Sequence, residues 1–201
     1  MERLEHEDFY KKLTDISQAK TFLGREFLAW LWFQMETNTE PTPIIVTNPK
    51  KTLSVSFWID DRIVLESLSN NSSLTHLIKG NNASRSLEAT AALKSGKSIK
   101  EVKLGVNIDT IGEYTAILSC KDLSPKSLKL PPFPEDLSNE DTDISKIDSR
   151  ISQTEIFLQV LDCMFSTFLD LRIDDSWTDD ILEKIRSWIK KRHTREIHLL
   201  H

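Results

Sequence analysis

The sequence predicts an α+β fold: an antiparallel sheet of two meanders packed on a buried N-terminal helix, with two C-terminal helices. The run Phe22 to Phe33, FLGREFLAWLWF, ends in seven successive apolar residues, and a helix that is apolar on every side is a buried helix. After Pro41 and Pro43 the apolar residues alternate, as they do in strands. Beyond residue 149 they return to helical spacing.

The first part of the chain predicts two helices. Apolar residues recur at helical spacing among charges, which indicates an amphipathic helix over Leu4, Phe9, Leu13 and Ile16. In the following run, Gly24, Arg25 and Glu26 favour a helix over a buried strand, and the run is too short to cross a bilayer. Pro41 and Pro43 end this helix because proline cannot continue it.

The middle of the chain predicts two groups of strands with a helix between them. Leu53 to Ile59 alternates, Asp60 and Asp61 interrupt the pattern, and Ile63 to Leu65 resumes it, which predicts a hairpin. Short strands are expected at Ile44 to Val46 and Leu74 to Ile78. A helix capped by Asn82 or Ser84 and ended by Gly96 follows, and then the strands Val102 to Ile108, Tyr114 to Leu118 and Leu128 to Leu130.

The domain organisation follows from these patterns. We expect an α+β core domain at 1–132, an acidic linker at 133–149 and a helical segment at 150–201 that packs on the core or on a second subunit. The long helix around Ile151 to Leu171 has a second apolar side, and its interface candidates are Ile156, Val160 and Met164. Ser176 and Asp179 are spaced like a capping box before the last helix.

From the amino-acid composition and the net charge we expect an ordinary cytoplasmic protein with no membrane association. Charged residues make up 28% and hydrophobic residues 39% of the chain, and the net charge of −5 gives no global attraction to nucleic acid. Cys120 and Cys163 are expected as free thiols. Nucleotide-binding glycine motifs are absent, the paired aspartates suit turns and helix starts, and the C-terminal histidines suit an exposed tail. We therefore predict no enzyme activity, catalytic residue, metal or cofactor.

Two basic segments remain as candidates for binding a polyanion. Each is most simply a solvated face, but each is also able to contact phosphates without reading sequence. Trp58 and Trp188 are candidates for stacking beside them, although tryptophan more often lies in a core. The candidate nucleic-acid-binding residues are Lys94, Lys97, Lys100, Lys103, Lys190, Lys191 and Arg192.

A family resemblance supports the nucleic-acid interpretation. The string GREFLAWLWF, then WIDDRIVLES, ALKSGKSIKEVKLGV and LKLPP, resembles the C-terminal part of the RdgC-type recombination-associated proteins, in the long bacterial versions with a GREFLxWLW helix. The resemblance spans about Thr21 to Pro132 and continues more weakly through DLRIDDSW. It implies an α+β protein that binds DNA without marked sequence preference, forms ring-like dimers and restrains recombinase action. We expect this chain to lack the long N-terminal part that helps such proteins to close a ring.

The sequence is therefore compatible with two functions. The first is a non-enzymatic, sequence-independent association with duplex DNA through lysine contacts to phosphate. The alternative is a protein-protein interaction or scaffold module that binds no nucleic acid, with an unidentified protein partner. A homodimer is compatible with either function.

Overall fold

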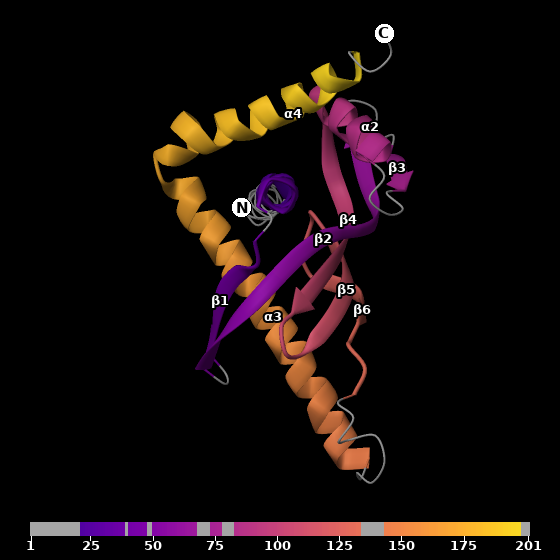
Figure 1. Ribbon diagram of the computed structural model, residues 1–201, viewed down its shortest axis with the longest axis vertical. Helices are drawn as coiled ribbons and strands as arrows, with labels where there is room; N and C mark the ends of the chain where they lie inside the picture. The colour runs from indigo at the N-terminus through magenta and orange to yellow at the C-terminus, as the bar shows by residue number, and fades with distance from the viewer. Residues whose placement is uncertain are drawn as a thin grey trace, which may run out of the picture.

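A helix at residues 21–37 passes through the middle of the protein in the computed structural model, between the sheet and the two C-terminal helices. Figure 1 looks along this helix, with α3 on one side of it, α4 across the top and the strands on the other side. The structure describes residues 21–38, 40–47, 50–67, 73–77, 83–133 and 143–197. The amphipathic helix expected over Leu4 to Ile16 lies outside these residues. The α+β class and the predicted arrangement of its helices are confirmed.

All strand pairs within the described residues are antiparallel and form one sheet of six strands. The order is β1-β2-β4-β5-β6, and β3 also pairs with β2. The two predicted meanders are therefore joined where β2 lies beside β4. The strands are β1 (Thr42–Thr47), β2 (Lys50–Ser67), β3 (Ser73–Leu77), β4 (Lys97–Ile108), β5 (Gly112–Ser119) and β6 (Pro125–Lys129).

The hairpin predicted at Asp60 and Asp61 is wrong, because β2 continues through both residues as one strand of 18 residues. The register with β4 shifts between Ile59 and Ile63, so the interruption in the apolar pattern is a β-bulge. Such a bulge bends a strand without ending it. The alternation on both sides of a bulge resembles that of a hairpin, which is why the two could not be separated from the sequence.

Three long helices and one π-helical turn complete the described fold. They are α2 (Ala83–Lys94), α3 (Asp143–Ile173), the π-helical turn η2 (Trp177–Ile181) and α4 (Leu182–Ile197). Gly96 follows α2 with a φ of +86°, as expected of a terminating glycine. The predicted capping box is wrong, because Ser176 makes no side-chain capping hydrogen bond. The Asp174 side chain instead accepts a hydrogen bond from the Ser176 backbone N–H.

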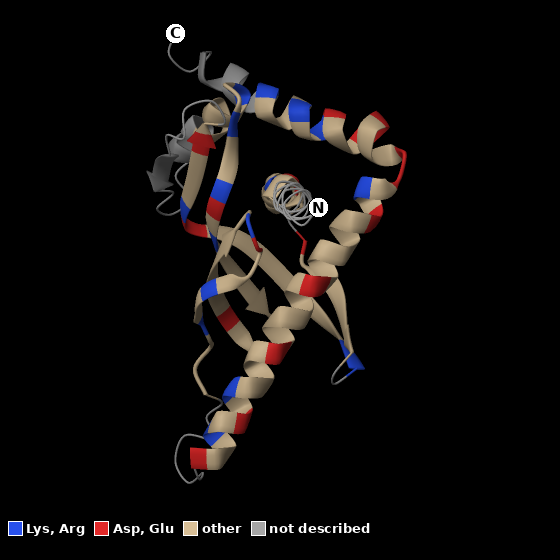
Figure 2. Cartoon of the chain, turned by 180° about the vertical axis from the view of Figure 1, so that it is seen from behind, with Lys and Arg blue, Asp and Glu red and all other residues tan. Residues whose placement is uncertain are grey.

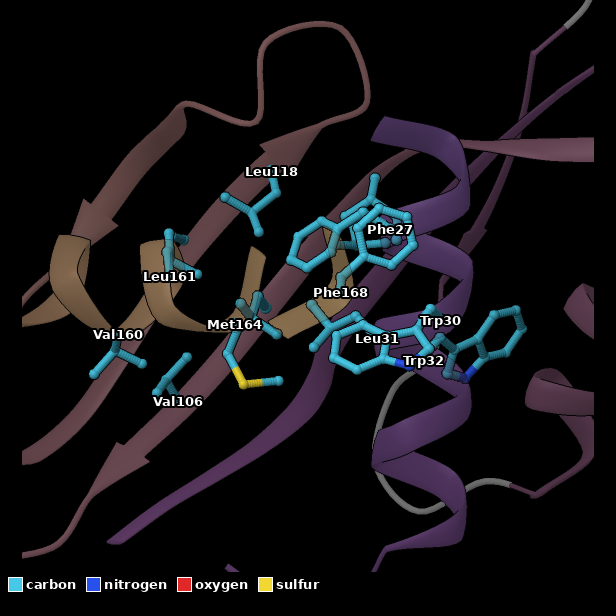
Figure 3. Close-up of a cluster of buried hydrophobic side chains, with 14 of the residues drawn as sticks. Phe27, Trp30, Leu31, Trp32, Val106, Leu118, Val160, Leu161, Met164 and Phe168 are labelled. Carbon is cyan, nitrogen blue, oxygen red and sulfur yellow. The ribbon is translucent and has the colours of Figure 1, made fainter. Parts of the chain in front are cut away.

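The predicted burial of helix 21–37 is confirmed by its side chains. Trp30, Leu31 and Trp32 are each at most 2% exposed. Figure 3 shows side chains of this helix meeting Phe168 of α3, and the Phe27 and Trp30 rings lie 5.5 and 5.8 Å from the Phe168 ring. On the α4 side, Trp188 makes an edge contact with Trp32 at 5.2 Å. The helix therefore has partners on several sides.

Gly24 allows this helix to approach the sheet closely. A Cβ at this position would collide with the backbone carbonyl of Cys120, at the end of β5. Any larger residue would push the helix away from the sheet, so the glycine in the run FLGREF serves close packing and not helix propensity.

The helical segment predicted at 150–201 shares the hydrophobic core of the sheet. Phe157, Val160 and Phe168 are fully buried within the same cluster as Val106 and Leu118. Helix α3 already begins at Asp143, so the last part of the predicted acidic linker is helical. No helix among the described residues is long and apolar enough to cross a membrane.

Candidate nucleic-acid interface

The two basic segments, far apart in the sequence, meet at one corner of the protein. Lys94 ends α2, and Lys97 and Lys100 lie at the beginning of β4. Helix α2 contacts the C-terminal helix α4. In Figure 2, blue segments on β4 and on α4 approach each other at this corner. We use the name basic corner for Lys94, Lys97 and Lys100 together with the C-terminal end of α4, which lies beside α2.

The three lysines of the basic corner are available to a ligand. Lys94 is exposed, Lys97 and Lys100 are partly exposed, and none of the three has an ion-pair partner among the described residues. Lys100 is the extra residue of a second irregularity, where Val64 pairs with Glu101 and Leu65 pairs with Ile99.

Nearby carboxylates are neutralised by other cations. Arg25 pairs with Glu66 at 2.5 Å, and Arg62 pairs with Glu101 at 2.6 Å. Because both carboxylates already have an arginine partner, they are held away from the lysines. Glu66 and Glu101, which lie beside these lysines on β2 and β4, therefore do not cancel the positive charge of the basic corner.

Lys103, in contrast, is not a free cation, and this part of the prediction is wrong. Its Nζ lies 2.7 Å from Asp60 and 3.0 Å from Asp61, the two aspartates of the β2 bulge. The hydrogen bonds that Lys103 donates to the Asp60 and Asp61 carboxylates raise its pKa, so the ammonium stays charged at neutral pH. A phosphate would have to displace two carboxylates to reach this lysine. The bulge explains the acidic pair: it turns both side chains toward the neighbouring strand.

The α4 candidates are described only in part. Lys190 is exposed on α4. Lys191 and Arg192 lie in the same helix, and their side chains are outside the described part of the structure.

The two tryptophans proposed for stacking have different surroundings. The Trp58 indole covers Gly105 of β4 so closely that a Cβ at position 105 would collide with it. It is partly exposed, on the face that Lys103 also occupies, because residues 103 and 105 share one side of a strand. Trp188 instead belongs to the core, in contact with Trp32 and Phe33. Both indoles are partly exposed, but the Trp188 ring packs against those two aromatic rings of helix 21–37, whereas Trp58 lies on the outer face of the sheet.

The candidate interface on α3 is covered by the protein itself. Ile156, Val160 and Met164 are 8%, 0% and 6% exposed, and Figure 3 shows Val160 and Met164 beside Val106 of the sheet. A second chain cannot reach them without opening the core, so their assignment to an interface is corrected. The opposite apolar side of α3 is open: Ile144, Ile147, Ile151 and Leu158 are 39–70% exposed.

Potential metal ligands and the two cysteines are the other reactive groups of the described residues. No three histidine, cysteine or acidic side chains are grouped so that they could hold a metal ion in the part of the chain that the structure covers. Cys120 and Cys163 are free thiols, and burial raises the pKa of both. Neither is therefore activated as a thiolate nucleophile.

Comparison with models of protein families, with curated proteins and with solved structures found no match for this chain.

Proposed function

We propose that this protein associates with duplex DNA through the basic corner, contacts phosphates and does not read the base sequence. The observation that supports this most is the convergence of α2, β4 and α4, which places lysines without an ion pair to any described residue beside the basic C-terminal end of α4. Lysine ammonium groups are point charges that suit phosphate oxygens without selecting a base.

The charge distribution supports a weak and salt-sensitive interaction. The net charge of −5 opposes binding to a polyanion at long range, so attraction depends on this local patch. Each phosphate that a lysine neutralises releases counterions, which makes the affinity fall as salt rises. The resemblance to the RdgC-type proteins stays a prediction and points in the same direction. Ring formation is not part of the proposal.

The proposal is tested by a fluorescence anisotropy titration of the full chain with labelled duplex DNA at low and at moderate salt. The wild type should bind two unrelated sequences equally. The triple variant Lys94→Glu, Lys97→Glu, Lys100→Glu should lose most of its low-salt affinity, and the slope of log affinity against log salt should fall by about 0.9 for each phosphate contact removed.

A matched control has the same change in net charge elsewhere. Lys50, Lys51 and Lys129 lie on β2 and β6, away from the basic corner, and Lys50→Glu, Lys51→Glu, Lys129→Glu should retain most of the binding. Equal losses in both variants would show that only net charge matters. Absence of wild-type binding at low salt would reject DNA association altogether.

The alternative function, a protein interaction module, is favoured by a different observation, the open apolar side of α3. It does not exclude DNA association, because the basic corner lies at the opposite end of the molecule from the beginning of α3 (Figure 1).

A further inference from the structure

The first part of α3 extends away from the rest of the protein and leaves large apolar side chains uncovered. The helix has 31 residues, about 46 Å at 1.5 Å per residue, and Figure 1 shows its beginning reaching beyond the sheet. Ile144, Ile147 and Ile151 are 70%, 57% and 51% exposed, and Leu158 is 39% exposed. A row of exposed apolar residues on one helix face is typical of an interaction site.

These residues form a regular stripe. The steps from 144 to 147, 151, 154 and 158 are three, four, three and four residues, the spacing by which one helix packs along another. Thr154 is the polar member. We call Ile144, Ile147, Ile151, Thr154 and Leu158 the α3 stripe. Because the core occupies the other side of α3, the stripe is left exposed by the described residues and has room for a second helix.

The stripe leads into a groove. Leu158 and Leu161 line a cavity of about 610 Å³ between α3, helix 21–37 and residues 118–125, together with Leu23, Phe27 and Phe165. An added helix that follows the stripe would therefore find further apolar contacts where α3 enters the core. The stripe and the groove together therefore form one continuous apolar surface along α3.

One flank of the stripe is a row of carboxylates. Asp148, Glu155 and Asp162 follow each other at intervals of seven residues, and all three are exposed. None of them has an ion pair or hydrogen bond with a described residue. At this position beside a helix pair, charged side chains select the partner by its charge.

On the other side of the stripe lie Lys146 and Arg150, and Arg150 is already engaged. Arg150 donates hydrogen bonds to the Pro131 carbonyl at 2.5 Å and to Gln153 at 3.0 Å, and it lies 3.8 Å from the centre of the Phe133 ring. It therefore holds residues 131–133 against α3. If a second copy of α3 packed antiparallel on the stripe, the two carboxylate rows would face each other. If it packed parallel, the row would face Asp143 and the engaged Arg150 of the other copy.

We infer that the α3 stripe docks an amphipathic helix of another protein, with an apolar face over the isoleucines and with lysine or arginine along its edge. The isoleucines supply apolar area, and the carboxylate row supplies selectivity for a basic partner. Neither element is shared with the basic corner, so this inference stands independently of DNA binding.

The test uses the full chain and designed peptides of about three heptads. The probe has leucine at its apolar positions and lysine at the flanking positions. One comparison peptide has glutamate at the flanks, and another has serine in place of leucine. By fluorescence anisotropy the lysine-flanked peptide should bind at least about tenfold more tightly than either comparison peptide, a difference of ~1.4 kcal/mol.

Two variants identify the surface. Ile147→Ser, Ile151→Ser should weaken binding of the lysine-flanked peptide by about tenfold or more. The control Ile45→Ser, Ile173→Ser changes isoleucines elsewhere that are more exposed, and it should not weaken binding. Asp148→Lys, Glu155→Lys should reverse the preference toward the glutamate-flanked peptide, and Asp109→Lys, Glu113→Lys is its control at the β4–β5 turn.

Three outcomes would overturn the inference: no difference between the peptides, equal losses in the control variants, or occupation of the stripe by a second copy. Sedimentation would reveal the last outcome as a wild-type dimer that Ile147→Ser, Ile151→Ser converts to a monomer. Because all of these substitutions lie on exposed positions, folding is retained and can be verified by circular dichroism. DNA binding measured on the isoleucine variant should be unchanged.

Discussion

The two halves of α3 have similar apolar spacing and opposite surroundings. In the second half, Val160 and Phe168 are completely buried, whereas in the first half Ile144 and Ile147 are 70% and 57% exposed. The difference comes from the neighbours, because the aromatic side chains of helix 21–37 pack against the second half. An apolar pattern therefore shows that a helix face suits an apolar partner, and the tertiary structure decides whether the chain itself provides one.

The largest effect is expected in the buried half, from Phe168→Ala. The Phe168 ring contacts Phe27, Trp30 and Trp177 at 5.4–5.8 Å. Its removal leaves a cavity among aromatic side chains and should lower the free energy of unfolding by about 3–5 kcal/mol. Urea unfolding followed by tryptophan fluorescence measures this. Phe22→Ala, at a side chain that is 52% exposed, is the control. Losses that are equal in the two variants would contradict the proposed difference in burial.

Gly24→Ala in helix 21–37 should change the free energy of unfolding by a smaller amount, and the sign of the change tells whether the helix is pressed against the sheet. On an uncovered helix the substitution would stabilise by about 1 kcal/mol, because alanine has the higher helix propensity. Here the new Cβ collides with the Cys120 carbonyl, so we expect a loss of about 1–3 kcal/mol. Thermal unfolding gives the sign directly. A higher melting temperature would mean that helix 21–37 is not pressed against the sheet at this point.

The core between α3 and the sheet should also respond to alkaline pH, through Tyr114 of β5. This side chain is fully buried and stacks on Phe157 at 5.3 Å, and burial raises its pKa to about 12. The unfolded value is about 10, so the stabilisation is complete below pH ~10 and is lost as pH rises toward ~12. Urea unfolding at several alkaline pH values should show a steeper loss for the wild type than for Tyr114→Phe. Equal pH dependence would contradict the burial of the phenol.

Much of the fold could be predicted from the sequence because local patterns and tertiary partners agree. The run ending FLAWLWF has no polar face, so its burial followed from composition alone. The β2 bulge was mistaken for a turn because the two aspartates were considered without Lys103, their partner on β4. That pairing depends on strand register, which the apolar alternation leaves open at an irregular point.

The candidate sites were predicted less well than the fold. Both apolar sides of α3 are visible in the sequence, but the choice of Ile156, Val160 and Met164 as the free side was wrong. Seven-residue spacing does not tell which side meets the sheet. For the basic segments, the charges are visible in the sequence, and only the fold shows that Lys97 and Lys100 have no ion-pair partner among the described residues while Lys103 is held by aspartates.

The smallest effect on stability is expected in the open half of α3, from Ile147→Ser, Ile151→Ser. Isoleucine and serine have similar helix propensities, and side chains that are exposed in the folded state lose little when they become polar. The free energy of unfolding should change by no more than ~0.5 kcal/mol for each substitution, against the several kcal/mol expected for Phe168→Ala. Urea unfolding at two protein concentrations tests both the magnitude and its origin. A large loss that is independent of concentration would mean that another part of this chain covers the α3 stripe, and one that grows with concentration would mean that a second copy does.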